Sequence, residues 1–187
     1  MTSEKKWNLA APCGLYCGAC LIYLASKRGD AELLRQIVKG IVARLGQEGK
    51  GMPPLRKGTV VSELRKQRLE AKDLACEGCL SETVALHCRL CGFRACAFEK
   101  GLLHCAQCVD SPCRELVDFN NDGLPHHGEV LTNIRRQQDI GIDVWIAEQA
   151  ERWRCPHCGC AIDWYARQCS GCGGVLNGCF DWPESLG

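Results

Sequence analysis

Seventeen cysteines in 187 residues, most of them in close pairs or triplets, constrain this chain more than any other feature. Two thiolates separated by two residues can bind one metal ion, because a tight turn brings both sulfurs within coordination distance of a common centre. We therefore predict metal binding by fifteen of the cysteines, which are Cys13, Cys17, Cys20, Cys76, Cys79, Cys88, Cys91, Cys96, Cys105, Cys108, Cys113, Cys155, Cys158, Cys169 and Cys172. Cys160 and Cys179 are expected outside the sites, although either could replace a ligand.

The other common use of many cysteines is a disulfide framework, and it fits this chain poorly. Disulfide-dense scaffolds are usually small secreted domains that cannot build a core, whereas 46% of this longer chain is apolar and its cysteine count is odd. The opening MTSEKKWNLAAPCG lacks the apolar run of a secretory signal. No segment approaches the roughly 18 apolar residues of a membrane span. We expect a cytoplasmic protein without a membrane segment, whose thiols are reduced.

The strongest metal signal lies near the C-terminus. RCPHCG and QCSGCG supply Cys155, Cys158, Cys169 and Cys172, and a glycine follows each pair. Glycine adopts the positive φ angle that lets backbone N–H groups turn toward the sulfurs. The pattern is similar to a zinc ribbon, in which two such turns form a closed tetrahedral site that mainly folds the module. We predict a structural Zn²⁺ ion and a β zinc ribbon here, with the segment WYA as a strand.

The middle block, residues 76–113, contains eight cysteines whose grouping the spacing leaves open. Sequence proximity would place Cys76, Cys79, Cys88 and Cys91 in one site and Cys96, Cys105, Cys108 and Cys113 in a second. Interleaved pairing is equally compatible, and His87 or His104 could replace one ligand. We expect short turns wrapped around metal ions in this block, with at most a hairpin.

The N-terminal triplet, CGLYCGAC, is the most ambiguous feature. Cys13, Cys17 and Cys20 leave a fourth coordination position open or require a partner from the middle block. Radical S-adenosylmethionine enzymes use the same spacing, but they usually carry an aromatic residue where this chain has Ala19, and they need a barrel that this sequence does not indicate. A structural zinc site shared with the middle block is the favoured interpretation. The alternative is an iron–sulfur cluster or redox-active centre at Cys13, Cys17 and Cys20.

Hydrophobic periodicity predicts a mainly α protein. Helices are expected from Asp30, as N-cap, to Leu45, over residues 62–75, 114–119 and 129–140, and from Asp143, again as a cap, to residue 153. The fold class is a small metal-stabilised protein, a helical cysteine-rich domain plus a C-terminal β zinc ribbon. The predicted divisions are a metal-binding domain at 1–122, a helical connector at 123–152 and the ribbon at 153–187. The pair His126-His127 could bind a metal ion or act as a base, but a polar loop is the preferred interpretation. The five tryptophans are expected to pack around the metal modules.

The quoted segments also carry a resemblance. It rests on five features, which are APCGLYCGACLIYLA, the helix after it, CEGC, CRLCGFRACAFEKGLLHCAQCVDSPCREL and the histidine pair. Together they resemble a prokaryotic cysteine-rich family of unknown function, whose members are often labelled zinc-binding proteins. The resemblance covers roughly residues 10–120, and it implies metal binding at the eleven cysteines from Cys13 to Cys113. It implies no reaction.

We conclude from the sequence that the chain is a zinc-binding protein with structural metal–thiolate sites, and that its folded surface docks a protein partner. No catalytic motif is present, so an enzyme is not favoured. A nucleic-acid partner is the remaining hypothesis. Residues 1–75 hold 14 Lys and Arg against 7 Asp and Glu, and a basic segment can attract phosphate. A solvated helix face explains the same charges and is preferred.

Overall fold

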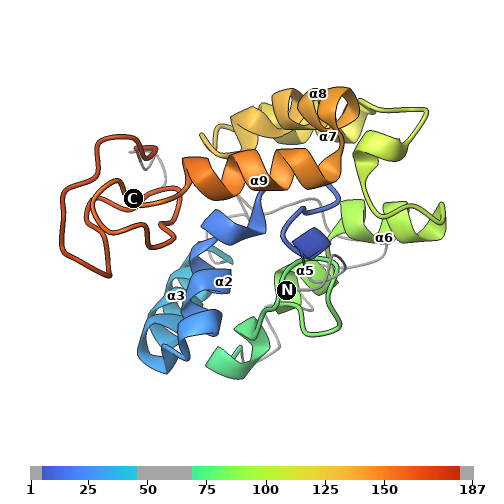
Figure 1. Cartoon of the computed structure of the whole chain (residues 1–187). Helices are drawn as coiled ribbons and strands as arrows, with labels where there is room; N and C mark the ends of the chain where they lie inside the picture. Colours follow the sequence, from blue (N-terminus) through green and yellow to red (C-terminus); the bar gives the residue numbers. More distant parts are fainter. Residues whose placement is uncertain (1–5, 46–68, 182–187) are drawn as a thin grey trace.

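The computed structural model describes residues 6–45 and 69–181, and these form a helical molecule (Figure 1). Its α-helices and 3-10 helices (η) are η1 (Cys17–Ala19), α2 (Leu21–Arg28), α3 (Ala31–Leu45), η2 (Ala71–Leu74), α5 (Leu86–Arg89), α6 (Gly92–Glu99), η3 (Cys105–Gln107), α7 (Arg114–Asn120), η4 (His127–Glu129), α8 (Val130–Ile140) and α9 (Ile142–Arg152). The predicted mainly α, cysteine-rich fold is confirmed. No helix within these residues is long and apolar enough to cross a membrane.

The first helical pair, α2 and α3, confirms one predicted boundary. The Asp30 carboxylate accepts a hydrogen bond from the Leu33 N–H at 2.9 Å, which satisfies a donor that the helix itself leaves free. The predicted loop after Gly46 and residues 62–68 of the next predicted helix lie outside the described residues. The rest of that helix is wrong, since residues 71–74 form only the single turn η2. The chain then extends into Cys76, whose N–H donates to the Ser26 hydroxyl at 2.9 Å.

The middle block is more helical than we expected from the sequence. We predicted turns and at most a hairpin, but α5, α6 and η3 occupy much of residues 86–107. In α6, Phe93 and Ala97 stand one helical turn apart and are both buried, and this spacing gives the helix an apolar face. The prediction failed because cysteine spacing, on which it rested, carries no information about this short apolar repeat.

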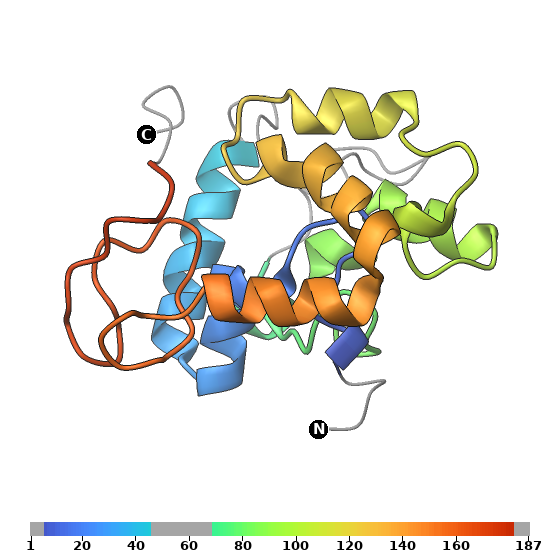
Figure 2. The same cartoon turned by 45° about the horizontal axis from the view of Figure 1, so that its top comes forward.

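Helices α8 and α9 meet at Gly141 and run in different directions across the molecule (Figure 2). The interruption at Gly141 was predicted, and the residue has φ 80° and ψ 158°. The predicted cap at Asp143 is wrong. Gly141 takes the cap position, and the Asp143 carboxylate instead accepts a hydrogen bond from the Trp7 indole N–H at 2.8 Å.

One hydrophobic cluster links distant parts of the chain. Trp145 of α9 is fully buried and packs edge-on against Tyr16, with ring centroids 6.1 Å apart. The same cluster includes Trp153 and two cysteines of the C-terminal segment, Cys155 and Cys169. The packing role predicted for tryptophan is confirmed for Trp7, Trp145, Trp153 and Trp164, while Trp182 lies outside the described residues. The domain divisions at 122 and 152 stay a prediction.

The predicted β zinc ribbon is wrong. Residues 153–181 contain no strand, only two isolated antiparallel bridges, Arg154 with Ala161 and Gln168 with Val175. Helix α9 continues to Arg152, so too few residues precede Cys155 for a ladder to extend. On the other side, the Trp164 N–H donates to the carbonyl of Ala19 at 3.2 Å, which directs the segment WYA toward the N-terminal part of the molecule instead of into a sheet.

Candidate metal centre

Four cysteines of the C-terminal segment converge on one point. The sulfurs of Cys155, Cys158, Cys169 and Cys172 all lie within 4.8 Å of one another. The Cys155 and Cys172 sulfurs are 3.7 Å apart, and those of Cys158 and Cys169 are 3.6 Å apart. Elsewhere in the described ranges, no three Cys, His, Asp or Glu side chains gather as closely. The grouping predicted from the two C-x2-C pairs is therefore the one that the structure brings together.

Each pair sits in a turn closed by backbone hydrogen bonds. The Cys155 N–H donates to the Cys160 carbonyl at 2.8 Å, and the Gly159 N–H donates to the Cys155 carbonyl at 2.9 Å. The second turn repeats these bonds from Cys169 to Gly174 and from Gly173 to Cys169, at 2.9 and 2.8 Å. Gly159 and Gly173 have φ angles of 74° and 72°, as the predicted need for glycine requires.

Backbone donors make this group of thiols suited to ionisation. The Gly171 N–H points at the Cys169 sulfur at 3.4 Å. Hydrogen bonds from the backbone N–H groups of Gly171 and Cys172 lower the pKa of Cys169 to about 6. The pKa of Cys172 rises to about 12, because the neighbouring sulfurs, Cys158 first, outweigh the lowering effect of the Gly174 N–H. One thiolate is thus stabilised, while a second negative charge beside it needs a cation.

The spacing of the sulfurs fits a tetrahedral metal ion. With a Zn–S bond of about 2.3 Å, two ligands of a regular tetrahedron have sulfurs about 3.8 Å apart. The two measured separations, 3.6 and 3.7 Å, are close to this value. Cys155 and Cys169 are buried, whereas Cys158 and Cys172 are exposed. Two of the four candidate ligands therefore lie in the core and two lie at the surface.

The cysteines of the N-terminal triplet and the middle block form a second, looser grouping. The Cys79 sulfur interacts with those of Cys17 and Cys88, and the Cys13 sulfur interacts with those of Cys91 and Cys105. Burial raises the pKa of the Cys13 thiol well above its usual range, and neighbouring sulfurs add to the effect. Metal binding by these eleven cysteines stays a prediction at this point.

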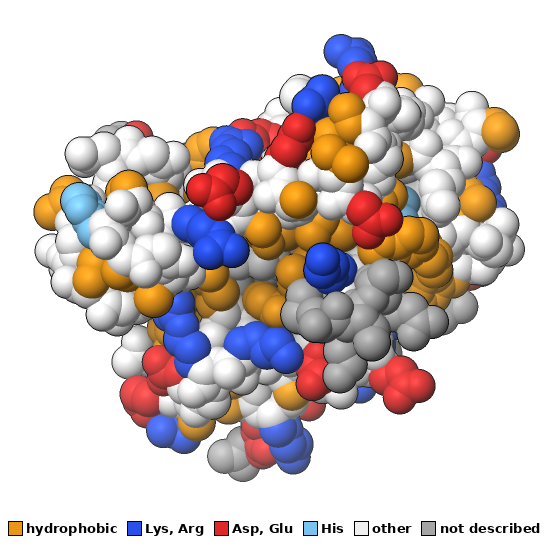
Figure 3. All heavy atoms as spheres, in the orientation of Figure 1, with side chains coloured by type: hydrophobic (Ala, Val, Ile, Leu, Met, Phe, Trp, Pro, Cys, Tyr) orange, Lys and Arg blue, Asp and Glu red, His pale blue; other side chains and the backbone are white. Residues whose placement is uncertain are grey.

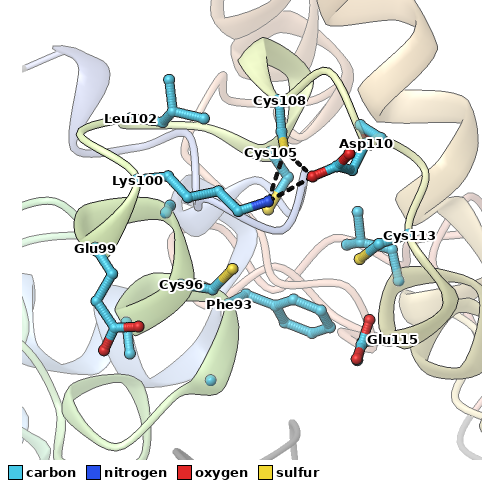
Figure 4. A pocket seen from close by; sticks show the side chains of 15 residues that line it. Phe93, Cys96, Glu99, Lys100, Leu102, Cys105, Cys108, Asp110, Cys113 and Glu115 are labelled. Atoms are coloured by element: carbon cyan, nitrogen blue, oxygen red, sulfur yellow. Dashed lines mark hydrogen bonds and ion pairs between the residues drawn. The ribbon is translucent and has the colours of Figure 1, made fainter.

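The remaining predicted set surrounds a pocket of about 660 Å³ (Figure 4). Cys96, Cys105, Cys108 and Cys113 all line it, but a lysine lies among them. The Lys100 ammonium is 3.3 Å from the Cys108 sulfur and 2.7 Å from the Asp110 carboxylate. The Cys105 sulfur interacts with those of the other three, but these four thiols are not gathered within 4.8 Å as the C-terminal four are.

All seventeen cysteines lie within the described residues, and none of them forms a disulfide. The two cysteines predicted to lie outside the sites differ from each other in surroundings. Cys160 is exposed and Cys179 is half-buried, with Cys179 packed against the cluster around Trp145.

The histidine pair was misjudged from the sequence. His127 is buried rather than in a polar loop, and its Nδ1 atom lies 2.7 Å from a carboxylate oxygen of Asp122. His126 stacks on Trp164 with ring centroids 4.3 Å apart, and its Nδ1 atom lies 2.6 Å from the Tyr165 hydroxyl. The pair thus joins the α7–α8 region to the C-terminal segment. The apolar residues on either side of it were the available signal.

Comparison with known protein families gives a match over the greater part of the chain. The sequence model of a family described as "Protein of unknown function (DUF3795)" matches residues 9–118, more than half of the 187 residues. The chain belongs to this family. The predicted resemblance to a cysteine-rich family of unknown function is confirmed. The DUF3795 match ends before the four-cysteine centre, which lies outside it. No curated protein and no solved structure matches the chain.

Proposed function

We propose that this member of the DUF3795 family is a zinc-binding protein, and that a Zn²⁺ ion held by Cys155, Cys158, Cys169 and Cys172 stabilises its C-terminal segment. The observation that carries the proposal is the convergence of these four sulfurs within 4.8 Å. Four thiolates in a tetrahedron favour zinc or iron among the common metals. Zinc needs no redox partner, and a closed four-thiolate shell has no open position for a substrate.

A structural role fits the surroundings of the site. Residues 153–181 have no helix and no strand, so backbone hydrogen bonds close separate turns there and form no continuous ladder. Two of the ligands, Cys155 and Cys169, are part of the cluster that contains Trp145 and Trp153. An ion that fixes these sulfurs would also fix the wall of that cluster. Its binding free energy then contributes to folding.

The folded surface is proposed to dock a protein partner. Three apolar residues that adjoin pocket-lining residues in the sequence stand at the surface: Val109 is 97% exposed, and Phe98 and Leu103 are each 40% exposed. The pocket lining itself includes the apolar side chains of Phe93 and Leu116. Exposed apolar groups around a concavity are typical of recognition surfaces. No reaction is proposed.

Nucleic-acid binding has weaker support. In the view of Figure 3, basic and acidic side chains alternate over the surface with hydrophobic atoms between them. Part of the basic N-terminal sequence, residues 46–68, lies outside the described residues. A mobility shift that weakens as salt rises would support this alternative, and no shift at low ionic strength would end it.

Metal content tests the zinc proposal. The double variant Cys158→Ser/Cys172→Ser removes the two exposed ligands and leaves the buried pair in the core. We expect plasma mass spectrometry to find one zinc ion fewer per chain than in the unchanged protein. Cys160→Ser is the matched control, an exposed cysteine in the same turn, and should retain the full count. Equal metal content in the double variant and the control would refute the site.

A further inference from the structure

Cysteines from two distant segments come together, two of them buried and three half-buried. Cys17 and Cys20 come from η1 and the start of α2, whereas Cys76, Cys79 and Cys88 follow more than fifty residues later. Cys17 interacts with Cys76 and with Cys79, and Cys20 interacts with Cys17 and with Cys76. Cys88 interacts with all of the other four. Five thiols thus share one neighbourhood, and two C-x2-C pairs are among them.

We propose that these five cysteines form a second, partly buried metal–thiolate site, in which one metal ion binds four of the five sulfurs and links the N-terminal segment to the middle block. The inference goes beyond the proposed function, because it concerns a different site within the part of the chain matched by the family. It does not depend on the C-terminal centre.

The backbone around the five thiols is already held in place. The Cys76 N–H donates to Ser26 of α2 at 2.9 Å. The Arg94 side chain of α6 donates to the Cys79 carbonyl at 2.9 Å. The carbonyl of Asn8 lies so near Gly78 that an added Cβ would be 2.2 Å from its oxygen. The turn between Cys76 and Cys79 is therefore in contact with Ser26 and Asn8 of the N-terminal segment and with Arg94 of α6.

The position of the thiols also matters for the core. Cys17 belongs to the cluster that contains Phe93 and Phe119, and Cys76 belongs to a different cluster with Leu34 and Leu74. Both are nearly inaccessible, with 6% and 5% of their surface exposed. An ion bound between them would join two otherwise separate hydrophobic cores by covalent-strength bonds. The metal would hold the two clusters together, and its binding free energy would contribute to the folding free energy.

Local donors and charge suit a thiolate site. The Gly78 N–H points at the Cys76 sulfur at 3.4 Å, as the Gly171 N–H does toward Cys169 in the C-terminal centre. Four thiolates around a divalent ion carry a net negative charge, and the partly buried guanidinium of Arg94 lies close by on the Cys79 carbonyl. The sulfurs are less tightly gathered than the C-terminal four. Rotation about χ1 moves a cysteine sulfur between staggered positions without moving the backbone, and this gives the five sulfurs a way to draw closer around an ion.

The simpler explanation is five neutral thiols packed as small apolar groups, because free cysteine is among the most buried residue types. The two explanations differ in their response to a chelator. Metal-bound sulfur becomes reactive when the ion is removed, whereas a thiol that is merely buried keeps its protection as long as the fold persists. They differ also in the metal content of cysteine variants.

Metal content of a double variant is the first test. Cys17→Ser/Cys79→Ser leaves three of the five thiols, too few for a four-thiolate site whichever four are used. We expect this variant to contain one metal ion fewer per chain than the control Cys160→Ser/Cys179→Ser, which removes the same number of thiols elsewhere. An unchanged count would overturn the proposal. The Cys158→Ser/Cys172→Ser variant loses a different ion, so the failure of one site is distinguishable from the failure of the other.

A second measurement uses the unchanged protein and does not depend on a variant folding. Thiols are alkylated under native conditions with and without a chelator, and the modified positions are mapped by mass spectrometry. We expect the five cysteines, including the half-buried Cys20, Cys79 and Cys88, to be protected without the chelator and modified with it, while exposed Cys160 reacts in both. Identical modification of the five in both conditions, with helical circular dichroism unchanged, would overturn the proposal. Metal analysis identifies the ion: zinc, or iron with acid-labile sulfide, supports the site, and protein without a metal ion at these thiols overturns it.

Discussion

Replacing Gly78 by alanine should destabilise the protein strongly, for two separable reasons. Gly78 has a φ angle of 108°, in a region where an L side chain costs about 1–2 kcal/mol. Its added Cβ would also lie 2.2 Å from the Asn8 carbonyl oxygen, a backbone atom that cannot move alone, and overpacking of this kind costs about 1–3 kcal/mol more. Together the structure predicts a loss of about 2–5 kcal/mol.

Gly123→Ala is the matched control, because Gly123 has a similar φ of 96° but no atom within 4 Å of its Cβ position. We expect it to lose only the backbone part, about 1–2 kcal/mol. Urea unfolding of both variants with excess zinc, followed by tryptophan fluorescence, gives the difference. If the two variants lose the same stability within about 0.5 kcal/mol, the turn at Gly78 does not contact the N-terminal segment, and the reasoning fails.

Two further predictions concern buried side chains. Burial, aided by the neighbouring His127, lowers the pKa of His126 to about 3, so the unfolded chain takes up its proton first as the pH falls below about 6.5. This residue should therefore reduce stability by up to about 2 kcal/mol between pH 7 and pH 5. His126→Gln should remove this contribution from a urea-measured stability profile and leave that of His127, whose pKa burial also lowers to about 3; an unaltered profile would contradict the neutral ring at His126. Trp145→Ala should cost about 3–5 kcal/mol, while its half-exposed neighbour Val144, changed to alanine, should stay within about 0.5 kcal/mol; comparable losses by thermal melting would show that the two faces of α9 were misassigned.

Features set by local spacing were predictable from the sequence. The C-terminal centre depends on two C-x2-C turns separated by ten residues, and each turn is determined by its own residues. The start of α3 at Asp30 is equally local, since the cap acts on the N–H of Leu33. In both cases the interacting groups are close in the chain, so spacing alone predicted the contact.

Features set by tertiary packing were not predictable in the same way. The meeting of Cys17 with Cys79 depends on how two segments fold together, and spacing left several groupings open. The absent β ribbon has the same origin: α9 continues to Arg152, and the Trp164 N–H bonds to Ala19 instead of a neighbouring strand. His127 was assigned to a loop because polarity was considered without the apolar neighbours that bury it.

The central claim is that sulfur from the cysteines binds a metal ion, and X-ray absorption at the edge of whichever metal co-purifies tests it most directly. The account predicts a first shell of sulfur only, with metal–sulfur distances of about 2.3 Å, in protein isolated without oxygen. A shell of nitrogen or oxygen, or protein isolated without any stoichiometric metal, would contradict it.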